Sequence, residues 1–388
     1  MNDPINNRDK TERQHLTQME LRGFKSIDDD GQSLSFGDIN LFIGPNGSGK
    51  SNVLAFFSLL NYLSTGAMNK FIFEDGGGAS AFLHDGPKVT RCIEANITFE
   101  NDEHRNTYAF TLSHAAGDRL LFTEEHLLWQ RADKEKPFAH TFEPGGFEAS
   151  LIEAAQHGEA GIIQKTASRF RQLLRGCQVF HFHDTSPQAR IHRQTNLHDN
   201  RFLRSDAGNL AAFLYRLRED YPNYYRRILS QVKRILPQFG DFILEPIGQN
   251  PNILLQWEDH KRDYLLGSQQ LSDGSLRFMA LATLLLQPPD LLPQVIVLDE
   301  PELGLHLDAM LQLIGMVRTA SAYSQIILAS HDTQLLNALD ASQIVVSTFD
   351  PQRKSSVFNR LPEEALAEWL ENYTMAELWE KNILGGKP

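Results

Sequence analysis

The stretch from Gly44 to Ser51 constrains the fold more than any other part of the sequence. It reads Gly-Pro-Asn-Gly-Ser-Gly-Lys-Ser and follows the apolar segment Ile39–Ile43, which predicts a buried strand. After it, apolar residues recur at helical spacing from Val53 to Leu63. A glycine loop between a strand and a helix turns backbone N–H groups toward an anion, and the helix adds the positive end of its dipole. The pattern G-x-x-x-x-G-K-S therefore predicts a loop that binds phosphate groups.

The residues of this loop have distinct expected roles. We expect the Lys50 ammonium to reach the β- and γ-phosphates of a nucleotide and the Ser51 hydroxyl to bind Mg²⁺. A plain glycine turn is the alternative, and it is disfavoured because every position of the pattern and both flanks match. The predicted nucleotide-binding residues are Gly44, Pro45, Asn46, Gly47, Ser48, Gly49, Lys50 and Ser51.

A second apolar segment ends in two acids. Val295–Leu298 predicts a strand that is buried on both faces, and Asp299 and Glu300 follow it directly. Ligands of such sheets bind beyond the carboxyl ends of the strands. We expect Asp299 to hold Mg²⁺ through water and Glu300 to polarise the water that attacks the γ-phosphate. A strand that merely ends in solvated acids is the alternative, and the phosphate loop makes it the weaker one.

The composition is that of an ordinary globular protein. Of 388 residues, 41% are hydrophobic and 22% are charged, and the net charge of −12 disfavours a generally basic nucleic-acid-binding protein. Cys92 and Cys177 form no CxxC pair, which indicates a reducing compartment. Met1–Gln14 lacks the apolar core of a signal peptide, and the apolar run Phe278–Leu286 is too short to span a membrane. We therefore expect a soluble cytoplasmic protein.

The order of the predicted elements indicates an α/β fold. Residues 70–145 alternate like antiparallel strands, whereas Glu148–Leu174 and Asn209–Leu236 have helical patterns. From Leu271 onward, strands alternate with helices, which predicts a parallel sheet. The expected units are a disordered tail (1–14), an N-terminal lobe with the phosphate loop and a β subdomain (15–145), a helical insert lobe (146–270), a C-terminal lobe (271–350) and a helical tail (351–388).

Three further motifs carry a family resemblance. Leu271–Ser275 resembles the signature motif of ABC-type ATPases, in the variant of the SMC/RecF/OLD-like group. Asp299–His306 resembles the joined Walker B motif and D-loop of that group, and Ile326–Asp332 resembles its switch-histidine strand. The order of the motifs also matches, with the phosphate loop as Walker A. The resemblance implies a P-loop NTPase head of the ABC type: a mixed central sheet with an antiparallel β subdomain and a helical lobe, without long coiled-coil arms.

This resemblance also implies a head-to-tail pair of chains around ATP and Mg²⁺. The signature of one chain, Ser272, Asp273, Gly274 and Ser275, would contact the γ-phosphate bound by the other chain. Because the sequence holds one Walker A motif and one signature, the complete site requires a homodimer or a higher oligomer. His331 would contact the γ-phosphate or the attacking water, and His306 would either cross the dimer interface or only cap a helix. Arg22 and Lys25 would border the adenine and the phosphates. No residue is assigned to the Q-loop glutamine, which leaves one Mg²⁺ contact without a residue.

The segment from residue 180 to residue 204 predicts a loop rich in His, Asp and Arg. A metal site is one interpretation of its histidines and Asp184, and loop or partner contacts are the favoured one, because no Cys and no second tight pair accompany them. Its arginines either bind nucleic acid or phosphate, or form surface salt bridges, which is the favoured interpretation. The residues concerned are His181, His183, Asp184, His192, His198, Arg190, Arg193, Arg201 and Arg204.

The motifs predict an enzyme that hydrolyses ATP to ADP and phosphate. In the first hypothesis, ATP-driven closure of the dimer regulates a separately encoded effector or a DNA transaction, in anti-phage defence or DNA repair. In the second, the chain is a slowly hydrolysing, nucleotide-gated scaffold for a separately encoded toxin or nuclease. A transporter ATPase is disfavoured by the Asp273 variant of the signature and by the segment from Glu302 to His306. No membrane partner is expected.

Overall fold

The computed structural model describes residues 13–74, 76–134, 136–158, 161–247, 250–260 and 264–386. Apart from residues 13 and 14, the tail predicted for residues 1–14 lies outside this range. Within the described ranges, no helix has both the length and the apolar character that a bilayer crossing requires.

A six-stranded central sheet carries the predicted motifs. Its order is β17-β16-β3-β15-β14-β8, and all neighbouring strands are parallel except the β16–β17 pair. The carboxyl ends of β3, β14, β15 and β8 therefore meet at one edge, where ligands of such sheets bind. The strands are β3 (Ile39–Ile43), β8 (Cys177–Phe180), β14 (Val295–Asp299), β15 (Gln325–Ser330), β16 (Ile344–Asp350) and β17 (Ser355–Arg360).

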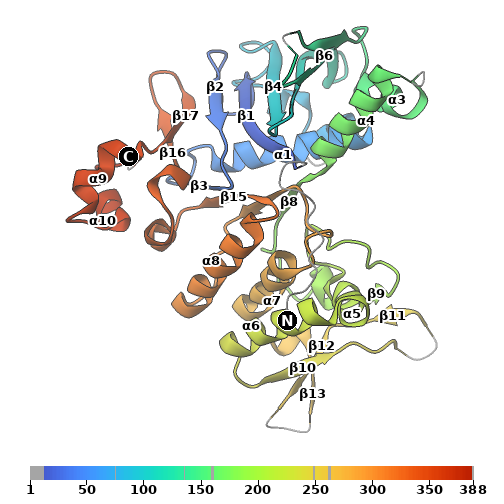
Figure 1. Ribbon diagram of the computed structural model, residues 1–388, viewed down its shortest axis with the longest axis vertical. Helices are drawn as coiled ribbons and strands as arrows, with labels where there is room; N and C mark the ends of the chain where they lie inside the picture. The colour runs from blue at the N-terminus through green and yellow to red at the C-terminus, as the bar shows by residue number, and fades with distance from the viewer. Residues whose placement is uncertain are drawn as a thin grey trace.

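The central sheet is covered on both faces, which explains why its strands are almost continuously apolar. Along β14, Ile296 and Leu298 pack with helices α7 (Asp273–Leu286) and α8 (Leu307–Ser321). Val295 and Val297 of the same strand point to the other face, where they pack with helix α1 (Lys50–Thr65). Figure 1 shows this layering, with α1 on one side of the central strands and α7 and α8 on the other.

A second, antiparallel sheet lies beyond α1 and confirms the predicted β subdomain (Figure 1). Its order is β2-β1-β4-β5-β6-β7, and aromatic side chains fix it to α1, as in the stacked pair Phe56 and Phe110, whose ring centroids lie 6.5 Å apart. The elements of this lobe are β1 (His15–Arg22), β2 (Gln32–Ser35), α2 (Met68–Glu74), β4 (Cys92–Glu100), β5 (His104–Ala115), β6 (Arg119–Arg131), β7 (Phe138–Thr141), α3 (Ser150–His157) and α4 (Ile162–Arg175).

The helical lobe packs against α7 on the far side of the central sheet (Figure 1). It combines two helices, a three-stranded sheet of order β10-β12-β13 and the short pair β9–β11. Its elements are β9 (Thr195–Asn196), α5 (Leu210–Asp220), α6 (Pro222–Ile235), β10 (Phe239–Ile243), β11 (Asn252–Ile253), β12 (Gln256–Asp259) and β13 (Leu265–Gly267). The remaining helices are α9 (Glu363–Leu370), α10 (Met375–Glu380) and the 3-10 turns η1 (Ala79–Ala81), η2 (Arg190–His192), η3 (Ser268–Gln270), η4 (Thr333–Ala338) and η5 (Ala341–Gln343).

Several predicted elements differ from the structure. The helix predicted over 148–174 is two helices, because Gly158 ends α3 and Gly161 precedes α4. The helix predicted over 209–236 is also two, because Pro222 has no N–H to continue α5 but can occupy the first turn of α6. The range 351–388, predicted as a helical tail, begins instead with β17, which pairs with β16 at the edge of the central sheet.

Candidate nucleotide-binding site

The phosphate loop has the conformation that its glycines predict. It connects β3 to α1, and Gly49, directly before the helix, has a φ of 100°, a left-handed conformation that favours glycine. At Gly44 the reason for glycine is space, since a Cβ would lie 2.2 Å from the Ser347 carbonyl oxygen of β16. The backbone of the loop therefore passes closer to β16 than any side chain would allow.

The polar side chains of the loop fit a bound phosphate. Lys50 is buried, and its Nζ donates to the carbonyl oxygens of Gly44, at 2.6 Å, and Pro45, at 3.0 Å. The Ser48 Oγ is buried and has no hydrogen-bond partner among the residues that the structure describes, whereas Ser51 is exposed on the first turn of α1. An anion in the loop would accept a hydrogen bond from the Ser48 Oγ. It would also replace the carbonyl oxygens of Gly44 and Pro45 as the acceptor for Lys50 Nζ.

Burial lowers the pKa of Lys50, and the nearby carboxylates of Glu300, Asp299 and Glu302 oppose that shift. The predicted base and metal ligand therefore lie within electrostatic reach of the loop lysine. Loop and acids come from β3 and β14, which are separated in the sheet only by β15. The sheet thus brings the two predicted halves of the site together.

Residues outside the motif hold the loop in place, and sequence reasoning missed them. Ser347 Oγ of β16 donates to the Ser48 carbonyl oxygen at 2.8 Å. Ser26 Oγ accepts from Asn52 Nδ2 on α1 and from Ser356 Oγ on β17, both at 2.7 Å. These serines lie far from the loop in the sequence, so no local pattern indicates their role.

Glu300 and His331, predicted to act on water or the γ-phosphate, contact each other. Glu300 follows β14, and His331 follows the neighbouring strand β15; His331 Nδ1 lies 3.2 Å from Glu300 Oε1. Glu300 has a φ of 38°, a left-handed conformation that is unfavourable for a residue with a Cβ. Its N–H donates to the Ala329 carbonyl oxygen of β15 at 2.8 Å, which holds that conformation.

Asp299, the predicted metal ligand, points into a polar corner of the sheet edge. Burial raises its pKa, and His183 and His181 oppose that shift. Both histidines follow β8: His183 Nε2 lies 3.9 Å and His181 Nδ1 lies 4.0 Å from Asp299 Oδ2. Asp184, by contrast, accepts from the Ser186 N–H, and His192 contacts Ser268 Oγ at 2.8 Å.

A buried acid near His331, Glu302, had no predicted role. Glu302 is 5% exposed and accepts a hydrogen bond from Ser330 Oγ at the end of β15. Ser330 Oγ in turn accepts from the Asp332 N–H at 2.9 Å, which fixes the backbone on both sides of His331. Burial raises the pKa of Glu302. A serine one residue before the switch histidine is the only signal for this network that the sequence offers.

The signature residues open helix α7. Ser272 is the N-cap, and its Oγ accepts from the Ser275 N–H at 3.2 Å, while Ser272 and Asp273 are exposed. Gly274 lies directly against the D-loop, because a Cβ there would lie 2.1 Å from the Gly304 carbonyl oxygen. The signature and the D-loop of one chain thus form a single backbone junction.

Arg277, one turn further along α7, ties this junction to the end of β8. Its guanidinium donates to the carbonyl oxygens of Phe182 at 3.0 Å, His183 at 2.8 Å and Leu303 at 3.0 Å. Sequence reasoning missed this residue. It holds the Asp299 corner, the D-loop and the signature helix in one hydrogen-bonded unit.

The D-loop histidine acts as a helix cap. His306 precedes α8, and its Nδ1 accepts from the Ala309 N–H at 3.3 Å, which is one of its two predicted roles. Leu303, Leu307 and Leu311 around it are exposed, at 38%, 57% and 57%. An apolar strip therefore lies beside the D-loop.

The predicted basic residues lie in several different environments. Lys25 Nζ lies 4.6 Å from the centroid of the Phe82 ring, burial lowers the pKa of this lysine, and Arg22 is exposed. In the segment 180–204, Arg190 pairs with Asp206 at 3.6 Å and Arg204 with Asp199 at 2.8 Å, as the salt-bridge interpretation predicts. Arg193, Arg201 and His198 are exposed.

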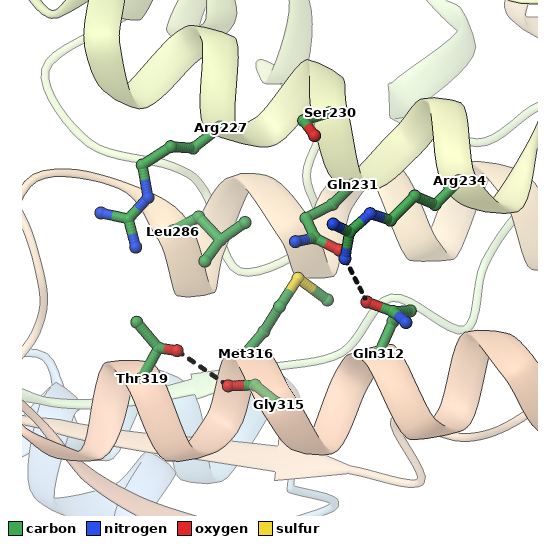
Figure 2. Close-up of a pocket in the computed structure, with 9 residues that line it drawn as sticks. All are labelled: Arg227, Ser230, Gln231, Arg234, Leu286, Gln312, Gly315, Met316 and Thr319. Carbon is green, nitrogen blue, oxygen red and sulfur yellow. Dashed lines mark hydrogen bonds between the residues drawn. The ribbon is translucent and has the colours of Figure 1, made fainter.

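A groove of about 350 Å³ lies elsewhere, between α6 and α8 (Figure 2). The guanidinium of Arg234 approaches Gln312 Oε1 to 3.5 Å across it, and Arg227 and Met316 line it as well. None of the residues predicted for the nucleotide lines this groove. The phosphate loop and the carboxylates instead meet at the sheet edge.

Comparison with known proteins agrees with this geometry. A family model described as "AAA domain" matches residues 18–226, more than half of the chain, and a second, "AAA domain, putative AbiEii toxin, Type IV TA system", matches residues 172–337. No curated protein matches the chain.

Solved SMC heads share the fold. An Smc head bound to the C-terminal winged-helix domain of ScpA is 15% identical and has a TM-score of 0.59, with 91% of this chain and 99% of that chain covered. An Smc head with an extended coiled coil, bound to the C-terminal domain of ScpA, from Pyrococcus furiosus, is 13% identical and has a TM-score of 0.57, with 92% and 99% covered. ATPases of this family normally bind ATP with Mg²⁺. The chain belongs to the AAA-domain family and has the fold of an SMC head.

Proposed function

We propose that this chain hydrolyses ATP to ADP and phosphate at the sheet edge formed by β3, β14 and β15. The contact between Glu300 and His331 carries this proposal: a carboxylate and an imidazole, 3.2 Å apart, end neighbouring strands beside the phosphate loop. A general base must be held in place to act on water, and His331 holds Glu300. Lys50 supplies the cation that the phosphates require.

In this proposal each side chain has a defined task. The residues from Gly44 to Ser51 bind the phosphates, and Ser51 and Asp299 hold Mg²⁺, which neutralises charge on the β- and γ-phosphates when it is bound. Glu300 orients the attacking water and accepts its proton. Arg22 and Lys25 border the nucleotide on the side of β1.

We propose that two copies close head-to-tail around two ATP molecules. Ser272 and Asp273 are exposed at the start of α7, where the helix N-terminus favours an anion. The exposed strip of Leu303, Leu307 and Leu311 flanks them across the Gly274–Gly304 junction and would be covered by the second copy. In this arrangement His306 keeps the D-loop in position by capping α8.

We further propose that closure regulates a separately encoded effector, a nuclease or a toxin, or a DNA transaction, in anti-phage defence or DNA repair. Two solved heads of the same fold are bound to a domain of ScpA, a separate protein, which supports a protein partner. One matching family model is described with a toxin of a toxin–antitoxin system, which supports an effector of that kind.

Steady-state hydrolysis by Glu300→Gln tests the proposal. We expect turnover to fall by about 10²–10⁴, the usual contribution of a general base, and the ATP-bound dimer to accumulate. Glu368→Gln, at an exposed position of α9, is the matched control and should keep the wild-type rate. Equal turnover in Glu300→Gln and wild type would refute Glu300 as the base. Wild-type binding with negligible turnover would favour the nucleotide-gated scaffold.

A further inference from the structure

Two histidines, His181 and His183, follow strand β8, which lies next to the strand that ends in Asp299. Strand β8 pairs in parallel with β14, and Phe180 lies opposite Leu298, so His181 is level with Asp299. In extended backbone, residues two apart point to the same side, which explains why His183 joins His181 in facing Asp299. A ring-centroid separation of 6.2 Å between the two imidazoles agrees with this arrangement.

The three side chains converge on one point. His181 Nδ1 and His183 Nε2 lie 4.0 Å and 3.9 Å from the same oxygen, Asp299 Oδ2, and one ligand atom from each residue lies within 4.8 Å of the other two. These separations are too long for hydrogen bonds, which require about 2.7–3.2 Å. Around a bound ion with bonds of about 2.1 Å, neighbouring ligand atoms lie about 3.0–3.4 Å apart, so small rotations of the rings complete the site.

The backbone around these side chains is held in place. A small cavity of about 10 Å³, about the size of one water molecule, adjoins His183, Asp299 and Glu300, and its other lining residues are Arg277 and five apolar residues. Arg277 binds the carbonyl oxygens of Phe182 and His183, which fixes the backbone that carries the imidazoles. The site is therefore held by the fold and not by a free loop.

We propose that His181, His183 and Asp299 form a three-ligand site for a divalent first-row transition ion of the Mn²⁺, Co²⁺ or Zn²⁺ type. Imidazole nitrogen is a good ligand for these ions, whereas Mg²⁺ prefers oxygen ligands and water. The site lies where the proposed function places the cation of ATP, because both include Asp299. The inference that the nucleotide site prefers such ions over Mg²⁺ rests on the proposed function. The inference that the chain binds such an ion without a nucleotide does not depend on the proposed function.

Co²⁺ titration of the full nucleotide-free chain tests the site, because tetrahedral or five-coordinate Co²⁺ with imidazole ligands absorbs visible light. We expect one Co²⁺ per wild-type chain, displaced by Zn²⁺ and retained in millimolar Mg²⁺. His181→Ala and His183→Ala should each weaken binding by more than about 100-fold, because losing a supporting contact alone costs about 10–100-fold. His198→Ala, an exposed histidine of the same segment, is the matched control and should bind like wild type. His181→Gln and His183→Gln repeat the test with side chains closer in size.

Two outcomes overturn the site: wild-type chain that binds no Co²⁺ below about 1 mM, or His181→Ala and His183→Ala variants that bind as tightly as His198→Ala. The proposed function is tested separately by Lys50→Ala, which should bind ATP at least tenfold more weakly and bind Co²⁺ like wild type. Normal Co²⁺ binding together with absent ATP binding in the wild type would sink the proposed function alone. Normal ATP binding with no Co²⁺ site would sink this inference alone.

Discussion

The substitution Gly274→Ala places one methyl group at the junction between the signature and the D-loop. The new Cβ would lie 2.1 Å from the Gly304 carbonyl oxygen and 3.1 Å from its carbonyl carbon. Both are backbone atoms, so no side-chain rotation relieves the overlap. Because ordinary contact begins at about 3.4 Å, the start of α7 and the D-loop must separate by roughly 1 Å.

The expected cost follows from this separation. Overpacking a close contact destabilises a protein by about 1–3 kcal/mol, and the gain from replacing glycine by alanine in a helix, about 0.5–1 kcal/mol, offsets part of it. We expect a net loss of about 1–2 kcal/mol in the free energy of unfolding. Gly315→Ala on α8 is the matched control, because a Cβ there meets nothing within 4 Å. It should stabilise the chain by about 0.5–1 kcal/mol.

Urea unfolding and sedimentation with a non-hydrolysable ATP analogue measure the two effects. If the signature binds the γ-phosphate of a second copy, a displacement of about 1 Å should weaken the ATP-dependent dimer tenfold or more, since a tenfold change corresponds to only about 1.4 kcal/mol. ATP binding to the single chain should stay within about twofold, because Lys50 and its loop lie on another element. A Gly274→Ala chain as stable and as dimeric as Gly315→Ala would refute this reasoning.

Three other outcomes are expected. Lys50→Ala should weaken ATP binding at least tenfold in a fluorescence titration, and unchanged affinity would contradict the phosphate-loop assignment. Ser272→Arg should prevent the ATP-dependent dimer in sedimentation while single chains still bind ATP; an unaltered dimer would count against a shared site. Burial raises the pKa of the Cys177 thiol to about 12. At pH 8 about one thiol in 10,000 is therefore ionised, and a thiol reagent followed by peptide mass spectrometry should label Cys177 only after unfolding; rapid labelling of the folded chain would oppose this.

The elements that could be predicted are those whose sequence pattern is forced by burial. Val295–Leu298 is apolar throughout, and Ile39–Ile43 is apolar except for Asn40, because helices cover both faces of the sheet. The phosphate loop was predictable because its glycines and Lys50 are required by local geometry and charge. In these two strands and in the loop between β3 and α1, the predicted local structure agrees with the observed one.

Strand β8 had no such local signal. Cys177–Phe180 is short, contains the polar Gln178 and follows α4 almost directly, so neither its length nor its pattern marks it as a sheet strand. Only its pairing with β14 places it. The spacing of His181 and His183 therefore does not indicate that both lie beside Asp299.

The junction between the signature and the D-loop could not be predicted for a different reason. Its contacts involve backbone atoms: Gly274 packs against the carbonyl group of Gly304, and Arg277 donates to three carbonyl oxygens. Every residue has a carbonyl group, so the identity of the acceptor residues leaves no trace in the sequence. In the sequence, Arg277 does not differ from other charged residues on helices. Its guanidinium N–H groups find their acceptors only when the fold brings the end of β8 and the D-loop next to it. Side-chain motifs thus predict where phosphates would bind, while the contacts that join the signature to the D-loop and to the end of β8 require the three-dimensional structure.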